Sequence, residues 1–135
     1  RGFPGNTIYH PNCFFFPSHT TRVLVEKEVD MVSGVGYNPA KRIAGGNFSG
    51  VDLRTIVTNL CVLDFGGPDH SIRLVSLHPD VSIDEVLQST GFPLSTGQTS
   101  ETPLPTAEQI EIIQKLDPLN IRATVIKDNP PARRG

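Results

Sequence analysis

The chain has 135 residues, which suits one domain or part of one, and 37% of them are hydrophobic. The formal net charge of −2 gives no general attraction to phosphates, so we expect no nucleic-acid partner. No apolar run approaches the ~18 residues of a membrane span, and two cysteines make no disulfide framework, so we expect a cytoplasmic protein without a membrane partner.

The first third of the chain predicts loops around short apolar segments. Residues 1–12 are rich in Gly, Pro and Asn, which favours a loop, and residues 13–16 form a short apolar run. Residues 22–25 are mostly β-branched or apolar and predict a buried strand. Residues 37–50 contain one proline and three glycines and predict another loop. The chain begins with Arg rather than Met, so we expect a processed chain, a subunit piece or a fragment.

The strongest β signal is in the middle of the chain. Residues 53–65 predict either one long bent strand or two strands that share a bulge. Residues 66–70 (GGPDH) then favour a turn, and residues 71–78 alternate between apolar and polar side chains. The two segments together predict an antiparallel hairpin.

A helix is predicted after this hairpin. Ser82 with Glu85 three residues later is a capping box, and we expect the helix to cover residues 83–90 and to stop at Gly91. Residues 91–105 are rich in Ser, Thr, Gly and Pro and predict irregular structure.

A second helix is predicted near the C-terminus. Thr106 with Gln109 forms its cap, Pro118 ends it, and its apolar face consists of Ile110, Ile113 and Leu116. Residues 128–135 predict a loose tail, which leaves residues 1–127 as the domain. The whole order predicts an α/β or α+β fold, and one strand-to-helix step at residues 71–82 favours α/β. Three or four strands with two short helices make a thin domain, so we expect an upstream segment or a partner chain to complete the sheet.

The first candidate site is the segment from Arg1 to Thr7. Gly2 and Gly5 around Pro4 allow a ligand to approach the backbone closely, and the N–H groups of Gly5, Asn6 and Thr7 could converge on an oxyanion or phosphate. Arg1 could pair with a carboxylate or phosphate. The alternative is a surface turn with a Pro-Gly corner.

Three other patterns have an ordinary structural explanation. His10, Cys13 and His19 lack a nearby fourth ligand, so a buried structural cysteine and surface histidines are favoured over a metal site. The three phenylalanines at 14–16 could line an apolar pocket or belong to the core. The polar residues around the 66–68 turn could be acid–base groups or could stabilise the turn; they are Asp64, Asp69 and His70.

Four collinear blocks carry a resemblance to a known family. They are RGFPGNT at 1–7, EVDMVSGVGY at 28–37, NLCVLDFGGPDH at 59–70 and SLHPDV at 76–81. These blocks resemble the C-terminal half of the β subunit of family I coenzyme A transferases, from Arg1 to about Asp117. The resemblance implies an α/β fold that is part of an open, mixed sheet with flanking helices, and an enzyme made of α and β subunits.

The family's chemistry, as the resemblance implies it, is ping-pong transfer of CoA between an acyl-CoA and a carboxylate through a glutamyl–CoA thioester. The nucleophilic glutamate lies in the missing N-terminal half of the family's β subunit. None of the glutamates here lies in a matching motif, namely Glu26, Glu28, Glu85, Glu101, Glu108 and Glu111. We therefore assign no nucleophile to this chain and expect no activity from it alone.

One departure from the family pattern points to a divergent branch. The family's G-x-G-G loop falls on residues 2–5, where Pro4 replaces a glycine and removes one N–H donor. The form R-G-x-P-G-N-T is similar to ring-opening hydrolases of CoA thioesters in bacterial steroid catabolism. That branch implies a glutamate in the partner α subunit and an arginine facing the substrate, a position that Arg1 matches.

The expectations for function are therefore three. The first is the β-subunit portion of a CoA-transferase-like enzyme, and the alternatives are a ring-opening hydrolase subunit or a non-catalytic module of such a complex. The expected partners are the α subunit, the missing N-terminal half and an acyl-CoA. We expect no metal and no permanently bound cofactor, with coenzyme A entering as substrate. The expected substrate-binding residues are Arg1, Gly2, Pro4, Gly5 and Asn6.

Overall fold

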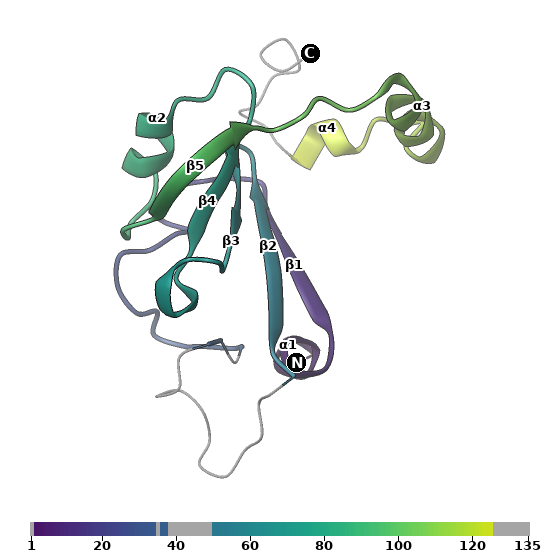
Figure 1. The fold of residues 1–135 in the computed structure, drawn as a ribbon. Coiled ribbons are helices and arrows are strands. Elements are labelled where there is room, and N and C mark those ends of the chain that lie inside the picture. Colours follow the sequence, from purple (N-terminus) through teal and green to yellow (C-terminus); the bar gives the residue numbers. More distant parts are fainter. Residues whose placement is uncertain (1, 35, 38–49, 126–135) are drawn as a thin grey trace.

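A computed structural model describes residues 2–34, 36, 37 and 50–125, and within them five strands form one sheet. The order is β1 (Pro11–Phe16), β2 (Asp52–Thr58), β3 (Cys61–Asp64), β4 (Arg73–Leu77) and β5 (Ser95–Glu101). The central strand β3 is antiparallel to both β2 and β4, whereas β1 runs parallel to β2 and β5 runs parallel to β4. The expected open mixed α/β sheet with flanking helices is confirmed (Figure 1).

The hydrophobic core lies on one face of the central strands. It consists of Ile56, Leu60, Cys61, Leu63, Leu74 and Val86. Val86 belongs to α2 (Ile83–Gln88), so this helix covers that face of the sheet. Phe14 and Phe16 pack against the same core, whereas Phe15, on the opposite side of β1, is 54% exposed. The core explanation therefore holds for two of the three phenylalanines, as the two-residue period of a strand requires.

The N-terminal segment differs from the expected loop. Residues Phe3–Tyr9 form the helix α1, and β1 follows directly. Pro4 occupies the second helical position, where the missing N–H leaves no hydrogen bond unmade, so a Gly-Pro-Gly sequence is compatible with a first helical turn. The predicted buried strand at 22–25 is also wrong. The N–H groups of Val23 and Leu24 both donate to the Thr20 carbonyl, which makes this run a turn.

The predicted long strand over residues 53–65 is two strands, and they form a hairpin of their own. β2 and β3 are antiparallel, with Val57 opposite Val62, and the chain reverses at Asn59 and Leu60. The predicted antiparallel pairing of this segment with residues 71–78 is confirmed between β3 and β4. The short 3₁₀ segment η2 (Pro68–His70) lies in the connection between them.

The two helix predictions hold with small changes. α2 begins after Ser82, whose Oγ accepts the Glu85 N–H, and ends two residues earlier than expected. α3 (Ala107–Leu116) has the full capping box of Thr106 and Gln109. Between these helices, the expected irregular segment contains β5, because its backbone pairs with β4 although most of its side chains are small and polar. The predicted tail at 128–135 and most of the predicted loop at 37–50 lie outside the described residues.

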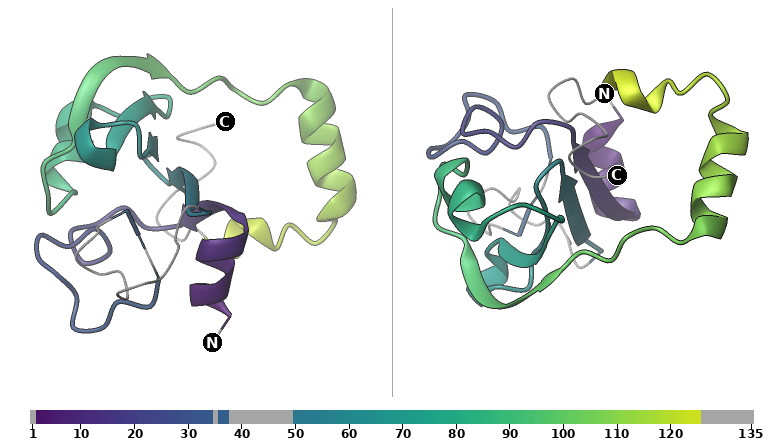
Figure 2. Two further views of the ribbon diagram at one scale, coloured as in Figure 1. Left: turned by 60° about the horizontal axis from the view of Figure 1, so that its bottom comes forward. Right: turned by 90° about the horizontal axis from the view of Figure 1, so that it is seen from above.

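α3 and α4 (Arg122–Val125) extend away from the sheet as an arm (Figure 2). The predicted apolar face of α3 is exposed there: Ile110 and Ile113 are each 41% exposed and Leu116 is 80% exposed. No helix in the described part of the chain is both long and apolar enough to cross a membrane.

Candidate functional site

The segment predicted to bind substrate forms the first turn of α1. Gly2 is the N-cap, and Gly2, Pro4, Gly5 and Asn6 are all exposed. The Asn6 N–H donates to the Gly2 carbonyl at 3.0 Å, so this N–H is engaged inside the helix. The expected convergence of three free N–H groups is therefore wrong at Asn6, because a helix uses its donors beyond the first turn. Arg1 lies outside the described residues.

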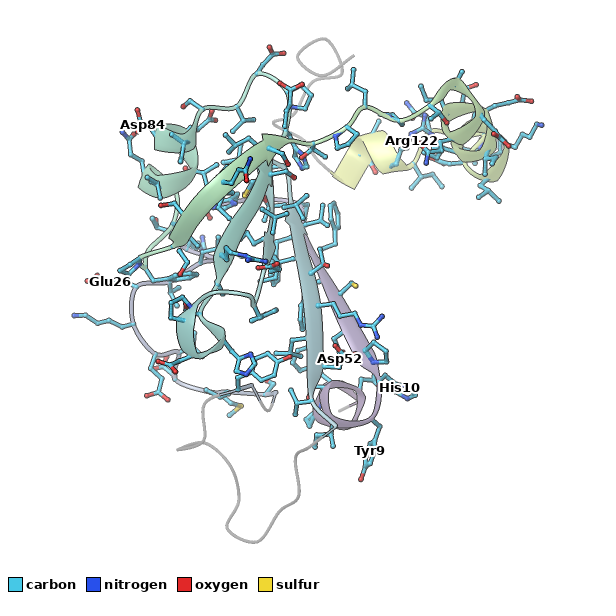
Figure 3. The ribbon with its side chains drawn as sticks, in the orientation of Figure 1. Tyr9, His10, Glu26, Asp52, Asp84 and Arg122 are labelled. Atoms are coloured by element: carbon cyan, nitrogen blue, oxygen red, sulfur yellow. The ribbon has the colours of Figure 1, made fainter. Side chains whose placement is uncertain are left out.

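α1 lies at the end of the sheet where β1 and β2 begin. Pro11 of β1 pairs with Asp52 of β2, and Figure 3 shows Tyr9, His10 and Asp52 at this same end. The Asn12 amide donates to the Asn6 carbonyl at 3.1 Å and so ties the helix to the first strand. The exposed first turn of α1 is thereby held at one edge of the sheet.

A contact between Gly34 and Phe3 links α1 with a cavity at this end of the sheet. A Cβ atom at Gly34 would lie 2.5 Å from Cε1 of Phe3, so the backbone at residue 34 lies against the ring of this α1 side chain. Gly36 and Tyr37, only two and three residues further on, line a cavity. A chain spans at most about 3.6 Å per residue, so this lining begins within about 7 Å of Gly34.

The cavity has a volume of about 540 Å³, within the usual range of small-molecule sites. Most of its wall is apolar and comes from Tyr37, Leu53, Phe65, Ile72, Phe92 and Pro93. Its polar side chains are Asp69, His70 and Ser71, at the η2 connection. None of the described residues that line it is a lysine or an arginine.

Tyr37 and His70 form the most ordered part of this wall. Their rings stack with centroids 4.1 Å apart and planes 17° from parallel. The Tyr37 hydroxyl accepts the Leu53 N–H at 2.9 Å, which fixes the ring against the start of β2. Asp69 and His70 have φ angles of 52° and 60°, a left-handed conformation that is uncommon outside glycine. Sequence reasoning missed Tyr37, because nothing in the sequence pairs it with His70.

The three polar residues around the 66–68 turn have different roles. The Asp64 carboxylate accepts two hydrogen bonds from the Arg73 guanidinium, at 3.0 and 2.6 Å, and one from the Gly66 N–H at 2.9 Å. The hydrogen bond from Arg73 is the main reason why the pKa of Asp64 is lowered. Asp64 therefore stabilises the turn, as the structural explanation predicts, whereas Asp69 and His70 line the cavity.

His10, Cys13 and His19 do not come together. Cys13 is exposed on β1, on the face opposite Phe14, so the expected buried structural cysteine is wrong. His19 is only 3% exposed, so the expectation of a surface histidine is also wrong there. Its Nδ1 and Nε2 lie 2.9 Å from Thr58 Oγ1 and Thr90 Oγ1. Among the described residues no cluster of histidine, cysteine and acidic side chains is placed to hold a metal ion.

The buried cysteine also has a structural environment. Burial raises the pKa of Cys61 to about 11, and its Sγ lies 3.6 Å from His19 Nδ1 within the core. A thiol with a raised pKa carries little thiolate near neutral pH and is a poor nucleophile. The residues with candidate binding roles are therefore those at the end of the sheet with α1 and the cavity.

Comparison with known proteins relates the chain to a small group of enzymes. It is 44% identical over 133 residues to the cholesterol ring-cleaving hydrolase IpdB subunit of Rhodococcus jostii, covering 90% of this chain and 48% of that protein. The IpdB subunit of Mycobacterium tuberculosis is 42% identical over 135 residues, covering 94% and 51%. The chain thus spans about half the length of these relatives. The chain matches no protein-family model.

A more distant similarity leads to CoA-transferases. A 3-oxoadipate CoA-transferase subunit of Pseudomonas knackmussii is 30% identical over 63 residues, covering 46% of this chain and 24% of that protein.

Both groups are also found among the solved structures that match the chain. The Rhodococcus jostii IpdAB structure matches with a TM-score of 0.83 at 41% identity, covering 93% of this chain and 51% of that one. Glutaconate coenzyme A-transferase from Acidaminococcus fermentans matches with a TM-score of 0.72 at 26% identity, covering 84% and 44%. The expected CoA-transferase-like fold, with the ring-opening hydrolases as near relatives, is confirmed.

Proposed function

We propose that this chain is part of the β subunit of a ring-opening hydrolase of CoA thioesters. The chain is homologous to about half of the IpdB subunit and has the CoA-transferase-like fold. The observation that carries the proposal is the 44% identity over 133 residues, because it extends along 90% of this chain instead of being confined to one motif. The TM-score of 0.83 against IpdAB supports the same choice.

In the proposed reaction water adds to a ring carbonyl of the substrate. The adjoining carbon–carbon bond breaks, a new carboxylate forms, and the released carbon takes up a proton. We propose that the glutamate that promotes this step belongs to the partner α subunit, so this chain alone is inactive. The structural neighbour IpdAB consists of an IpdA and an IpdB subunit by its name, which supports a partner subunit for this chain.

This chain's proposed contribution is to bind the thioester substrate. Gly2, Gly5 and Asn6 on the exposed first turn of α1 let the substrate approach the backbone, and Arg1 pairs with developing negative charge. Pro4 starts the helix without contributing a donor. Both cysteines are free thiols, which agrees with the cytoplasmic location that we propose.

CoA transfer is the second candidate, and the similarity to a 3-oxoadipate CoA-transferase and to glutaconate CoA-transferase favours it. Mass spectrometry of the complete enzyme, assembled with its partner and incubated with a cyclic acyl-CoA, separates the two. A glutamyl–CoA adduct supports transfer, whereas a ring-opened acid with the CoA thioester intact supports hydrolysis. Neither adduct nor turnover leaves the third expectation, a non-catalytic module.

A further inference from the structure

We infer that the cavity beside α1 binds the neutral carbocyclic ring of the substrate and excludes the nucleotide of coenzyme A, with His70 and Tyr37 as ring-binding residues. The inference rests on the proposed function for the identity of the substrate. It adds where the ring lies and which side chains hold it, neither of which follows from the similarity to known enzymes.

The charge of the wall decides which part of a CoA thioester fits. The nucleotide of coenzyme A carries phosphates, and phosphate sites in proteins use arginine, lysine or clustered backbone N–H groups. The described lining has no cationic side chain and includes the carboxylate of Asp69. Repulsion from this carboxylate disfavours phosphate and free carboxylate alike, so the occupant is a neutral group.

The composition of the wall suits a ring ketone. Leu53, Phe65, Ile72, Phe92 and Pro93 provide an apolar surface, and a volume of about 540 Å³ accommodates a fused bicyclic skeleton. The polar side chains lie together at η2, so a ligand with an apolar body and one polar end matches the distribution. The imidazole of His70 carries at least one N–H, which it can donate to a ring carbonyl.

The local backbone explains how His70 is presented. Two consecutive non-glycine residues in the left-handed region persist only where their surroundings hold them, and such conformations concentrate at functional sites. Here the Tyr37 ring stacks on His70, and the turn is closed tightly at Gly67, where a Cβ atom would lie 2.4 Å from Ser71 Oγ. The imidazole is therefore fixed before any ligand arrives.

The position of the cavity agrees with this assignment. Its lining begins within about 7 Å of Gly34, which touches Phe3 in the first turn of α1. A thioester placed along Gly2 and Gly5 would thus have its acyl ring near the cavity. The CoA portion would extend in another direction.

The test uses the complete enzyme assembled with its partner subunit and measures binding of hydrindanone, a fused bicyclic ketone without CoA, by ligand-observed NMR. His70→Asn removes the ring but retains a residue type that tolerates a positive φ. We expect its Kd for hydrindanone to rise about tenfold. Asp80→Asn is the matched control, because Asp80 has a φ of 64° and does not line the cavity. Its Kd should change less than about twofold.

A second variant keeps the inference testable if His70→Asn does not fold. Phe92→Trp fills the cavity with a larger apolar side chain and should weaken hydrindanone binding at an unchanged melting temperature. Failure of hydrindanone to bind the wild type, an unchanged Kd in both variants, or displacement of hydrindanone by ADP, which carries the phosphates, would each overturn the inference. Opening of the substrate ring in a cyclic acyl-CoA is assayed separately. An enzyme that opens the ring but does not bind hydrindanone refutes this inference alone. An enzyme that only transfers CoA refutes the proposed function.

Discussion

The side chains of His19 and Thr90, which are 71 residues apart in the sequence, share a hydrogen bond of 2.9 Å between Nε2 and Oγ1. Thr90 Oγ1 itself donates to the Val86 carbonyl at 2.7 Å, so it must accept from His19. His19 therefore carries a proton on Nε2, and its Nδ1 lies 2.9 Å from Thr58 Oγ1, which donates to the Cys61 carbonyl at 3.2 Å. One imidazole thus joins the segment before β2, the end of β2 and the residues after α2.

Replacing this histidine should destabilise the fold. His19→Ala removes a buried ring and leaves the hydroxyls of Thr58 and Thr90 without their shared partner, so we expect a loss of about 2–4 kcal/mol in the free energy of unfolding. Urea denaturation of the assembled enzyme measures the loss. His10→Ala, at an exposed position, should stay within about 0.5 kcal/mol. Equal effects of the two substitutions would contradict the structural role of His19.

The same residue predicts a pH dependence of stability. Burial lowers the pKa of His19 below its ordinary value of 6.5, so the unfolded chain binds a proton more readily than the folded one. The contribution of His19 to stability is complete above pH 6.5 and is lost as the pH falls below it. Denaturation midpoints between about pH 7.5 and pH 5 should therefore fall with pH, and less steeply in His19→Gln. Parallel curves for the two proteins would assign the dependence to other groups.

Two substitutions of Asp64 separate its ion pair with Arg73 from its hydrogen bond with the Gly66 N–H. Asp64→Asn keeps an oxygen for the Gly66 N–H and loses the ion pair with Arg73, whose side chain is 46% exposed. Partly exposed ion pairs contribute little, so we expect a cost below about 1 kcal/mol. Asp64→Ala also leaves the Gly66 N–H without its partner and should cost about 1 kcal/mol more. Thermal denaturation of both variants measures this difference, which vanishes if the ion pair dominates, because both variants lose it.

Two glycines provide a steric test of the packing. A Cβ atom at Gly91 would lie 2.5 Å from both the Leu24 carbonyl oxygen and the Glu26 nitrogen, which are backbone atoms that cannot move aside cheaply. Gly91→Ala should therefore destabilise the fold by about 2 kcal/mol or more. At Gly97 nothing lies within 4 Å, so Gly97→Ala should be neutral to within about 0.5 kcal/mol. Differential scanning calorimetry of the two variants tests this contrast.

The proposed role of Arg1 predicts a catalytic effect with little change in stability. We expect Arg1→Ala in the complete enzyme to lower kcat/KM by about tenfold or more. The exposed Arg54, which pairs with Asp52, is the control, and Arg54→Ala should leave kcat/KM within about twofold. An unchanged kcat/KM in Arg1→Ala removes this residue from the site.

Local signals in the sequence predicted the elements that depend on local chemistry. The Thr106–Gln109 cap and the antiparallel pairing of β3 with β4 follow from side chains close in sequence. α1 was missed because Gly2, Pro4 and Gly5 are common in turns, although Pro4 also fits the first turn of a helix. β5 was missed because an edge strand of small polar residues is defined by its backbone pairing with β4.

The candidate site was predictable only in part. The sequence identified the first turn of α1 and placed His70 in a turn, but the cavity depends on segments that meet only in the fold. Tyr37 reaches His70 and Leu53 through tertiary contacts, and the left-handed backbone at Asp69 and His70 has no sequence signature comparable to a glycine.

The arrangement of strands in the sheet also implies an order of folding. β2, β3 and β4 follow one another through tight connections, so their pairing closes only short loops, whereas β1 reaches β2 only after the whole of segment 17–51. Contacts between residues near in sequence form faster than those between distant ones. We therefore expect the three central strands to pair before the two outer strands add. Amide hydrogens of Ile56 and Leu63 should exchange more slowly than those of β1 and β5.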